Sequence, residues 1–362
     1  MIIVHISSAT TWRGGEQQIA YLLVELSKKN IDQILFCPKN SPLFHFCINH
    51  TIPVSTYRRI SGVDLLFALK IKLFCSKAIK PIIHVHDSHS HTNAFISSFI
   101  WNNKTPIIVH RRVSFTVNRG IFLAFKYRHK SVVRIICVSD YVRQIVDDTL
   151  GESGKTITIY DGIDLTRFEW KSGKNLLHTQ FHISSKLRLI GNISALTREK
   201  DLFTFIDTAE ILLLRHSDII FIIIGDGPDK QAITEYIKLK KLDNKVLLTG
   251  FIENIPYVLQ ELNLFLFTSV NEGLGTSILD AFACKVPVVS TCAGGIPEIV
   301  KNNFTGLTTP IRQPIAMADA VDTILSNSEF RNIIISNAFA FVKDFSIVKT
   351  TSEIINIYLQ TP

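Results

Sequence analysis

Hydrophobic and polar residues follow two different periods along this 362-residue chain. Short runs rich in Val, Ile and Leu predict β-strands, and between them apolar residues recur every three or four positions, which predicts helices over 16–29, 203–215 and 230–240. Some runs, such as DIIFIIIG at 218–225, are apolar almost throughout, as in parallel strands covered by helices on both faces. The predicted strands are MIIVHI, QILFCP, PIIHVHD, TPIIVHRR and RIICVS in the first half, and LRLIGNI, DIIFIIIGDG, KVLLTG, LNLFLFTS and VPVVST in the second.

This alternation predicts an α/β fold with two doubly wound, Rossmann-like domains, each built on a parallel sheet. The length of the chain suits two domains of ordinary size. A Gly-containing turn in YDGIDLTRFEW, residues 160–170, marks the expected boundary. The segment FSIVKTTSEIINIYLQ, residues 345–360, predicts a terminal helix.

Charge is distributed unevenly between the two halves. Residues 1–160 contain 20 Lys and Arg against 9 Asp and Glu, whereas residues 161–362 contain 19 against 22. None of the six cysteines belongs to a C-x-x-C pair, which favours reduced thiols in a cytoplasmic protein. The chain has no basic leader before its first apolar run, and no run approaches the roughly 20 residues of a membrane-spanning helix. We therefore expect a cytoplasmic protein that is soluble or peripheral on a membrane.

The stretch NEGLGTSILDA, residues 271–281, follows a predicted strand and opens a predicted helix. Gly273 and Gly275 allow a ligand to approach the backbone closely. The amides at the start of the helix, at Thr276 and Ser277, suit a diphosphate. The turn is therefore a candidate anion site.

Two acids bracket this turn, Glu272 before it and Asp280 in the helix. Eight residues at a helical rise of about 1.5 Å separate their carboxylates by on the order of 12 Å, roughly the span from a sugar to a ribose across a diphosphate. Beside a phosphate, such acids are useful as acceptors of hydrogen bonds from sugar hydroxyls. The alternative is that both acids are surface charges and that the glycines only form the turn.

Three further loops that follow predicted strands suit the same kind of ligand. A Gly-Gly pair precedes a helix at 14–15 and again at 294–295, and GNISALTREKDL, residues 191–202, places Arg198 and Lys200 where they could neutralise phosphate charge. The alternatives are ordinary turns and a solvated charge cluster. The G-x-G-x-x-G pattern of a dinucleotide-binding enzyme is missing, which counts against a dehydrogenase.

The segment HVHDSHSH, residues 84–91, gathers histidines and an aspartate at the end of another strand. Residues of these types can bind a metal. His84 and His86 share one face of the strand, so a core position for His84 and a sugar-hydroxyl contact for His86 are the favoured alternatives. We expect no metal site.

The segment NRGIFLAFKYRHKSVVR, residues 118–134, combines apolar residues at helical spacing with basic ones. Such a helix can lie on an anionic lipid surface or turn its apolar face into the core, and both alternatives stay open. Nucleic-acid binding is not expected, because no recognition motif accompanies the charges. The basic residues expected on the membrane or acceptor side are Arg111, Arg112, Lys126, Arg128 and Lys130.

Taken in order, the motifs RGGEQQ, HVHDSH, YDGID, GNISALTREKDL, GDGP and EGLGTSILDAFACKVPVVSTCAGGIPEIV resemble those of glycosyltransferase family 4, the retaining enzymes of the GT-B fold. The resemblance covers essentially the whole chain. It implies an interdomain active-site cleft between an acceptor-side domain, residues 1–160 with a C-terminal helix at about 346–362, and a nucleotide-sugar-binding domain, residues 161–345. Asp161 stands where the family commonly has Asn, which we interpret as a structural difference.

The resemblance also implies roles for individual residues. Glu272 and His86 would contact the donor sugar as catalytic residues, Asp280 the ribose and Lys200 the phosphate. Asp280 departs from the family, which has Glu there, and the family's phosphate-binding arginine is replaced by Asn in the loop after the strand, so we assign its role to Arg198. The other donor-binding residues implied are Gly15, Asn192, Gly273, Gly275, Thr276 and Ser277.

The predicted function is that of a retaining, metal-independent hexosyltransferase with no cofactor. It would move a sugar from a nucleotide sugar to a lipid-linked, lipopolysaccharide or surface-polysaccharide acceptor, on the inner face of the cytoplasmic membrane. The N-terminal half would contact the anionic membrane surface. Two alternatives stay open: a nucleotide-sugar epimerase of the same fold, and a non-catalytic module that binds sugar nucleotides or membranes.

Overall fold

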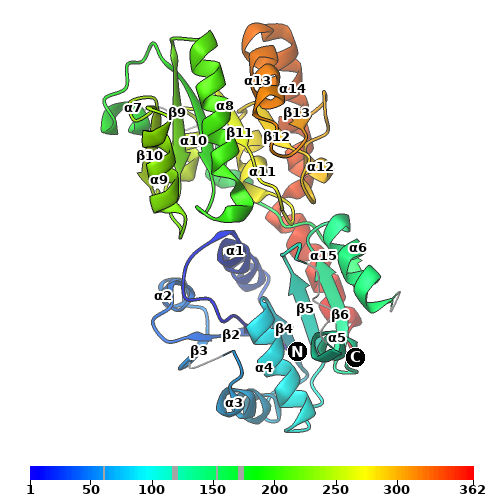
Figure 1. Ribbon diagram of the computed structural model, residues 1–362. Helices are drawn as coiled ribbons and strands as arrows, with labels where there is room; N and C mark the ends of the chain where they lie inside the picture. The colour runs from blue at the N-terminus through cyan, green and yellow to red at the C-terminus, as the bar shows by residue number, and fades with distance from the viewer. Residues whose placement is uncertain (60–61, 116–120, 152–153, 170–174) are drawn as a thin grey trace. The chain divides into compact units, whose positions relative to one another are not determined.

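The chain forms two compact units in the computed structural model (Figure 1). One unit consists of residues 1–162 and 347–362, and the other of residues 163–346. No helix in the described part of the chain is both long and apolar enough to span a bilayer. The structure describes residues 1–59, 62–115, 121–151, 154–169 and 175–362.

The first unit is built on a seven-stranded parallel sheet in the order β3-β2-β1-β4-β5-β6-β7. The order reverses at β1, so right-handed crossovers put helices on both faces of the sheet. Its strands are β1 (Ile2–Ile6), β2 (Gln33–Pro38), β3 (Val54–Tyr57), β4 (Pro81–Val85), β5 (Ile107–Arg111), β6 (Val132–Cys137) and β7 (Thr156–Thr158). Its helices are α1 (Gly14–Lys28), α2 (Pro42–Asn49), α3 (Leu65–Cys75), α4 (Ser88–Phe99), α5 (Ile121–Arg128), α6 (Asp140–Leu150) and α15 (Ile347–Gln360).

The final helix, α15, belongs to this first unit although the second unit precedes it in sequence. It packs beside α1 and contributes Ile354, Ile357 and Tyr358 to a core that also contains Ile3 of β1. The Tyr358 hydroxyl lies 2.6 Å from Nδ1 of His84 in β4. The end of the chain therefore completes the first hydrophobic core.

The second unit contains a six-stranded parallel sheet in the order β10-β9-β8-β11-β12-β13, and its order reverses at β8. All six residues of β9 are buried, because helices cover both faces of this central strand. Its strands are β8 (Arg188–Ile193), β9 (Ile219–Ile224), β10 (Val246–Gly250), β11 (Leu264–Phe267), β12 (Val288–Thr291) and β13 (Leu307–Thr309). Its helices are η1 (Leu165–Phe168), α7 (Leu176–Gln180), η2 (Arg198–Lys200), α8 (Leu202–Arg215), α9 (Lys230–Leu239), α10 (Ile255–Leu259), α11 (Thr276–Ala283), α12 (Ile296–Ile299), α13 (Pro314–Ser326), α14 (Ser328–Phe341) and η3 (Val342–Phe345).

The predicted fold is confirmed: two Rossmann-like units with parallel sheets. Every strand predicted from an apolar run is present, and the three predicted internal helices are found as α1, α8 and α9. The strands that sequence reasoning missed are β3, β7 and β13, which lie at sheet edges and have three or four residues each. An edge strand buries less of its surface, so its sequence lacks a continuous apolar run.

Candidate functional site

The turn before α11 leaves helix amides available to a ligand. Gly275 precedes the helix with φ +95°, a left-handed conformation that favours glycine. No side chain caps α11, so its first amides, at Thr276 and Ser277, have no partner within the helix. These amides are of the kind that binds anions at helix starts, and anion binding here stays a prediction.

Glu272 pairs with Lys200 beside this helix start. Lys200 Nζ donates to Glu272 Oε2, and the two side chains are only 20% and 16% exposed. The Ser269 hydroxyl lies 3.3 Å from the same carboxylate oxygen, and Thr268 Oγ1 donates to the Lys200 carbonyl at 2.9 Å. The loops that follow β8 and β11 are thus joined, and they bring together two charges 72 residues apart in sequence.

A third loop fixes the backbone of Glu272. Gly295 N donates to the Glu272 carbonyl oxygen at 3.1 Å. Gly294 has φ +57°, and a Cβ added there would lie 2.1 Å from that same oxygen, so only glycine fits. The Gly-Gly pair at 294–295 therefore positions Glu272: the first glycine allows the close approach, and the second donates the hydrogen bond.

Two other polar residues predicted to bind the donor, Arg198 and Asn192, differ in exposure. Arg198 on η2 is exposed. Asn192 is buried in β8, where its amide donates to the Leu266 carbonyl at 2.8 Å and accepts from Ser194 Oγ at 2.7 Å. These bonds occupy the amide and link β8 to β11, so the side chain has a structural role; the predicted contact of Asn192 with the donor stays a prediction.

Asp280 lies in the second turn of α11 and is half-buried. Loss of hydration raises the pKa of its carboxyl to about 7, although the nearby Arg167 of η1 acts in the opposite direction. Burial also raises the pKa of Cys284, one turn further along, to about 12, and the Asp280 charge adds to that shift. Asp280 is therefore a carboxyl group whose ionisation is costly in the unliganded protein.

Replacing Asp280 by asparagine is expected to stabilise the second unit at alkaline pH. The unfolded carboxyl ionises near pH 4 and the folded one near pH 7, so the parent loses stability as pH rises through this window, and asparagine avoids that loss. With the shift discounted for partial exposure, the gain should be on the order of 2 kcal/mol at pH 8 and close to zero at pH 4. Urea unfolding of both proteins at the two pH values measures it. Equal stabilities at pH 8 would show that the carboxyl is well hydrated.

Gly15 lies in the first turn of α1, at the carboxyl end of β1. A Cβ added at Gly15 would meet no atom within 4 Å, so the space beside it is open. Glu16 accepts from the Arg13 amide at 2.9 Å, which satisfies one amide at this helix start, and burial raises the pKa of Glu16. Gly15 is therefore accessible to a ligand, as its predicted role requires.

His86 belongs to a cluster of four buried histidines at the carboxyl edge of the first sheet. The others are His5 of β1, His84 of β4 and His110 of β5. Nδ1 of His5 lies 3.0 Å from Nε2 of His86, and the ring centroids of His84 and His86 are 4.3 Å apart. Burial lowers the pKa of every member, that of His5 to about 3, so all four imidazoles are neutral near pH 7.

Arg112 and Asp161 hold this cluster in one arrangement. Arg112 Nε lies 3.1 Å from each carboxylate oxygen of Asp161. Its two terminal nitrogens donate to Nδ1 of His86 at 3.3 Å and to Nδ1 of His110 at 3.1 Å. Since a guanidinium can only donate, both histidines carry their proton on Nε2, and His86 passes the chain of bonds on to His5. The imidazole of His86 therefore has both nitrogens engaged.

Three of these histidines also come close enough to hold a metal ion. One ring nitrogen from each of His5, His84 and His86 lies within 4.8 Å of the others. However, the proton on Nε2 of His86 and the adjacent positive charge of Arg112 oppose a cation there. In the segment 84–91, Asp87 is occupied by bonds from Ser8 and Ser90. The absence of a metal requirement stays a prediction.

The basic residues expected on the membrane side divide into buried and exposed ones. Lys126 is 1% exposed and donates to the Ser88 carbonyl and to Thr92 Oγ1, each at 3.1 Å, and burial lowers its pKa to about 8. Arg111 is also buried and donates to the Tyr127 hydroxyl at 3.0 Å, and Arg112 serves the histidine cluster. Arg111 and Lys126 are therefore too buried for the membrane surface expected of them, whereas a place on the acceptor side stays a prediction for all three residues. Arg128 and Lys130 are exposed.

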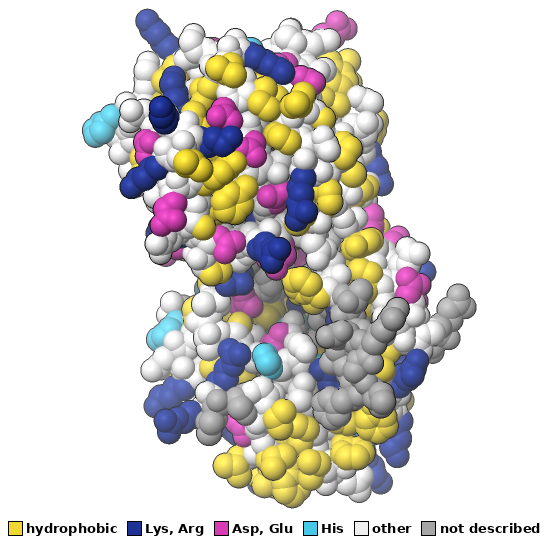
Figure 2. Space-filling view, viewed as in Figure 1, with side chains coloured by type: hydrophobic (Ala, Val, Ile, Leu, Met, Phe, Trp, Pro, Cys, Tyr) yellow, Lys and Arg dark blue, Asp and Glu magenta, His cyan; other side chains and the backbone are white. Residues whose placement is uncertain are grey.

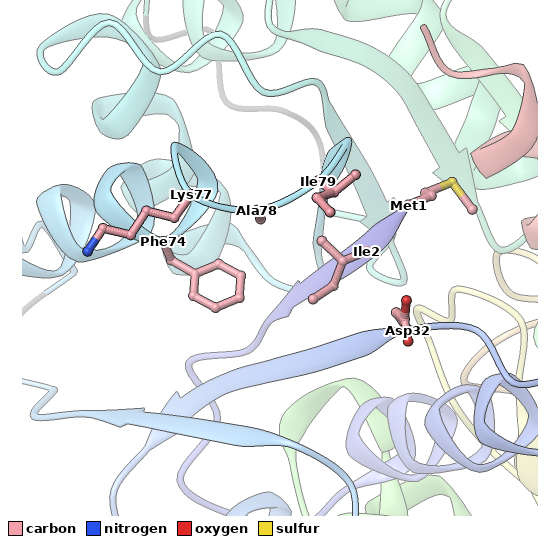
Figure 3. A pocket seen from close by; sticks show the side chains of 7 residues that line it. All are labelled: Met1, Ile2, Asp32, Phe74, Lys77, Ala78 and Ile79. Carbon is pink, nitrogen blue, oxygen red and sulfur yellow. The ribbon is translucent and has the colours of Figure 1, made fainter.

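A shallow pocket of about 440 Å³ lies on the first unit (Figure 3). Met1 and Ile2 line it at the start of β1, together with Ile79 and with Phe74 of α3. It therefore opens at the amino edge of the sheet, whereas the candidate residues lie at the carboxyl edge. In doubly wound sheets the ligand binds at the carboxyl edge, so this pocket is not the candidate site.

Sequence reasoning missed His5, His110 and the Arg112–Asp161 pair. A signal was present, because three strands of the first sheet each carry a histidine near their carboxyl end, and His5 is paired with His84 in register. Predicting the cluster required knowing that β1, β4 and β5 are neighbours in the sheet. The apolar pattern does not encode that order.

Two family profiles match consecutive parts of the chain. Glycosyltransferase Family 4 matches residues 12–167, and Glycosyl transferases group 1 matches residues 174–341. The two matches follow each other in the order of the two units and leave out little beyond the chain ends. The chain belongs to glycosyltransferase family 4. Its fold is GT-B, as the family resemblance predicted.

Curated glycosyltransferase relatives are similar in sequence, and a solved structure is similar in fold. The chain is 24% identical to N-acetyl-alpha-D-glucosaminyl L-malate synthase of Bacillus anthracis, over 77% of this chain and 75% of the relative. It is 22% identical to UDP-Gal:alpha-D-GlcNAc-diphosphoundecaprenol alpha-1,3-galactosyltransferase of Escherichia coli, over 95% and 93%. The structure of Anabaena HepE in complex with UDP and glucose superimposes with a TM-score of 0.87 at 20% identity, covering 100% of both chains.

Proposed function

We propose that this protein transfers a sugar from a nucleotide-sugar donor to a lipid-linked, lipopolysaccharide or surface-polysaccharide acceptor, with retention of anomeric configuration. The observation that carries the proposal is the Glu272–Lys200 pair beside the uncapped start of α11. It offers an acceptor for sugar hydroxyls, a cation for phosphate and free amides within one small region. The acceptor class is proposed because the relative from Escherichia coli is named for a diphosphoundecaprenol-linked substrate.

In the proposed complex, the charged pair exchanges partners. Lys200 turns from Glu272 to the diphosphate and is joined by Arg198, while Glu272 accepts hydrogen bonds from the sugar. The helix amides at Thr276 and Ser277 bind the same phosphates. Until the donor binds, the ion pair compensates both of these partly exposed charges.

The proposed reaction replaces one bond at the anomeric carbon by another on the same face of the sugar. The bond to the diphosphate oxygen breaks, its electron pair stays with the diphosphate, and the acceptor hydroxyl oxygen bonds to the anomeric carbon. The departing phosphate oxygen takes the acceptor's proton. Lys200, Arg198 and the amides stabilise the negative charge that develops on the diphosphate, with no metal or cofactor in the scheme.

Asp280 and His86 complete the proposed donor contacts. The carboxylate of Asp280 accepts from the ribose hydroxyls, and because its pKa is about 7, donor binding should tighten as pH rises from 6 to 8. His86 reaches the sugar after releasing its bond to either Arg112 or His5. Both contacts rest on the family resemblance.

Nucleotide-induced stabilisation tests the donor site directly. A nucleoside diphosphate at about 100 times its dissociation constant adds about 2.7 kcal/mol to native stability, which raises the melting temperature by about 5–10 °C for a unit of this size. Differential scanning fluorimetry compares UDP, GDP, ADP and CMP and their sugars. Arg198→Gln is expected to weaken the response. Lys186→Gln, which changes an exposed lysine before the amino end of β8, is expected to preserve it.

The response to nucleotides separates the proposed function from its competitors. No stabilisation by any nucleotide would contradict a donor site of the proposed kind. Isomerised sugar nucleotide in the absence of an acceptor would favour an epimerase. Stabilisation without transfer to any lipid-linked or glycan acceptor would favour a non-catalytic binding module.

A further inference from the structure

The first unit exposes large apolar side chains on two of its helices. Leu66 and Leu73 of α3 are 77% and 53% exposed, and Phe99 at the end of α4 is 59% exposed. In Figure 2, hydrophobic side chains gather at the lower end of this unit, where Figure 1 shows α3 and the end of α4. We call this set the apolar ledge; it consists of Leu65, Leu66, Leu73, Phe99, Ile100, Trp101 and Phe125.

The members of the apolar ledge come from neighbouring helices and from the residues that follow α4. Helices α3 and α4 pack side by side, with Ala68 of α3 in the same small core as Phe95 and Ile96 of α4. The two rings of Phe99 and Phe125 are 5.9 Å apart and perpendicular, which joins α5 to the ledge. An apolar surface of this extent marks an interaction site, whereas scattered apolar residues do not.

The sequence of α3 does not match that of a solvent-facing helix. One side of LLFALKIKLFC packs inward through Phe67, Ala68, Ile71 and Cys75. A helix on the surface of a soluble protein normally carries polar residues on its outer side, but here that side carries leucines. The outer face of α3 therefore has the composition of a surface that something apolar covers.

Most charges in the part of the sequence that carries the apolar ledge are positive. Residues 64–139 contain 12 Lys and Arg and two acids: Asp64, whose carboxylate caps the start of α3, and Asp87, whose oxygens are bonded to Ser8 and Ser90. Exposed basic residues follow α3 at Lys77 and α4 at Lys104. Two more, Arg128 and Lys130, flank His129, whose ring lies 6.4 Å from that of Phe99. We call these four residues the basic rim.

We propose that the apolar ledge and the basic rim dock this protein on a membrane that contains anionic lipid. The ledge would enter the boundary between headgroups and acyl chains, and the rim would pair with lipid phosphates. The inference deepens the proposed function, on which it rests for the membrane as the place where the acceptor is found. It moves the docking surface from Arg111, Arg112 and Lys126 to α3, the end of α4 and the exposed part of α5.

Vesicle flotation of the full chain without nucleotide tests the docking surface. The parent should float with phosphatidylcholine vesicles that contain about one-third phosphatidylglycerol, and float much less with pure phosphatidylcholine. The double variant Leu66→Ser/Phe99→Ser should bind anionic vesicles at least about tenfold more weakly, because two large apolar side chains no longer leave water. The matched control is Leu214→Ser/Leu239→Ser, which removes side chains that are 87% and 75% exposed in the second unit and should bind like the parent.

A second pair of variants tests the basic rim. Lys104→Gln/Lys130→Gln should weaken binding by about fivefold per charge, since each cation near an anionic surface contributes about 1 kcal/mol. The difference should disappear in high salt, where surface charges are screened. Lys186→Gln/Lys238→Gln removes two exposed lysines from the second unit and should change nothing.

Three results would overturn the proposal. The first is a parent protein that does not bind anionic vesicles. The second is equal binding by the ledge variant and its control variant. The third is a parent dimer in light scattering that Leu66→Ser/Phe99→Ser dissociates, which would assign the ledge to a second copy of the chain. Melting temperatures of all variants verify folding. Because the ledge variants should keep the response to nucleotides, failed docking and a failed donor site give different results.

Discussion

Glu272→Ala is expected to lower the rate of sugar transfer at least about a hundredfold, the usual cost of losing one oriented polar group in an active site. The loss should fall on the catalytic rate and not on nucleotide affinity, because Glu272 is proposed to contact the sugar. Lys200 loses its partner in this variant and becomes free to pair with the diphosphate. UDP or the matching nucleotide should therefore bind as tightly as to the parent or more tightly. Steady-state kinetics and nucleotide titration measure the two effects.

Two variants make this prediction specific to Glu272. Glu272→Gln keeps the shape and one acceptor oxygen, so its activity should lie between those of the parent and the alanine variant. Glu253→Gln changes an exposed acid in the same unit and should remain fully active. Because Glu272 and Lys200 are partly exposed, the ion pair contributes little to folding, and melting should shift only slightly. A transfer rate of Glu272→Ala within about tenfold of the parent's would contradict the assigned role.

The sequence was sufficient for the parts of the fold that rest on local patterns. Continuous apolar runs such as β9 predict buried parallel strands, and the glycine before α11 predicts a helix start with available amides. The edge strand β13 was not predicted, because its three residues, Leu307–Thr309, are too few to show a recognisable apolar pattern. The residue types within each loop were therefore enough to predict which loops form the candidate site, without knowledge of the loops' neighbours in space.

Contacts between distant residues could not be predicted in the same way. Nothing in the sequence pairs Lys200 with Glu272, or turns the amide of Asn192 towards Leu266 inside the sheet. Lys126 looks like a surface charge by composition, yet Ser88 and Thr92 of α4 hold its ammonium inside the unit. In each case the position depends on which elements become neighbours, and hydrophobic periodicity carries no information on that choice.

The same limit applies to Asp161, the residue at which this chain departs from the Asn common in its family. Asp161 pairs with the guanidinium of Arg112 through both of its carboxylate oxygens, which gives this residue a structural role. Burial raises the pKa of Asp161 above its usual value, and Arg112 opposes that shift only in part. The pair is therefore held in a costly environment, where losing one partner has large consequences.

Asp161→Ala is expected to destabilise the first unit by about 3–5 kcal/mol, because it leaves the guanidinium of Arg112 uncompensated beside two neutral histidines. Asp161→Asn should cost less than half as much, since its amide oxygen still accepts from Arg112 Nε. Adding Arg112→Met to Asp161→Ala should recover part of the loss by removing the unpaired charge. Denaturant unfolding gives the energies, and faster hydrogen exchange in β4 and β5 would locate the change. If the double variant is no more stable than Asp161→Ala, the loss of stability arises from a cavity and not from the buried charge.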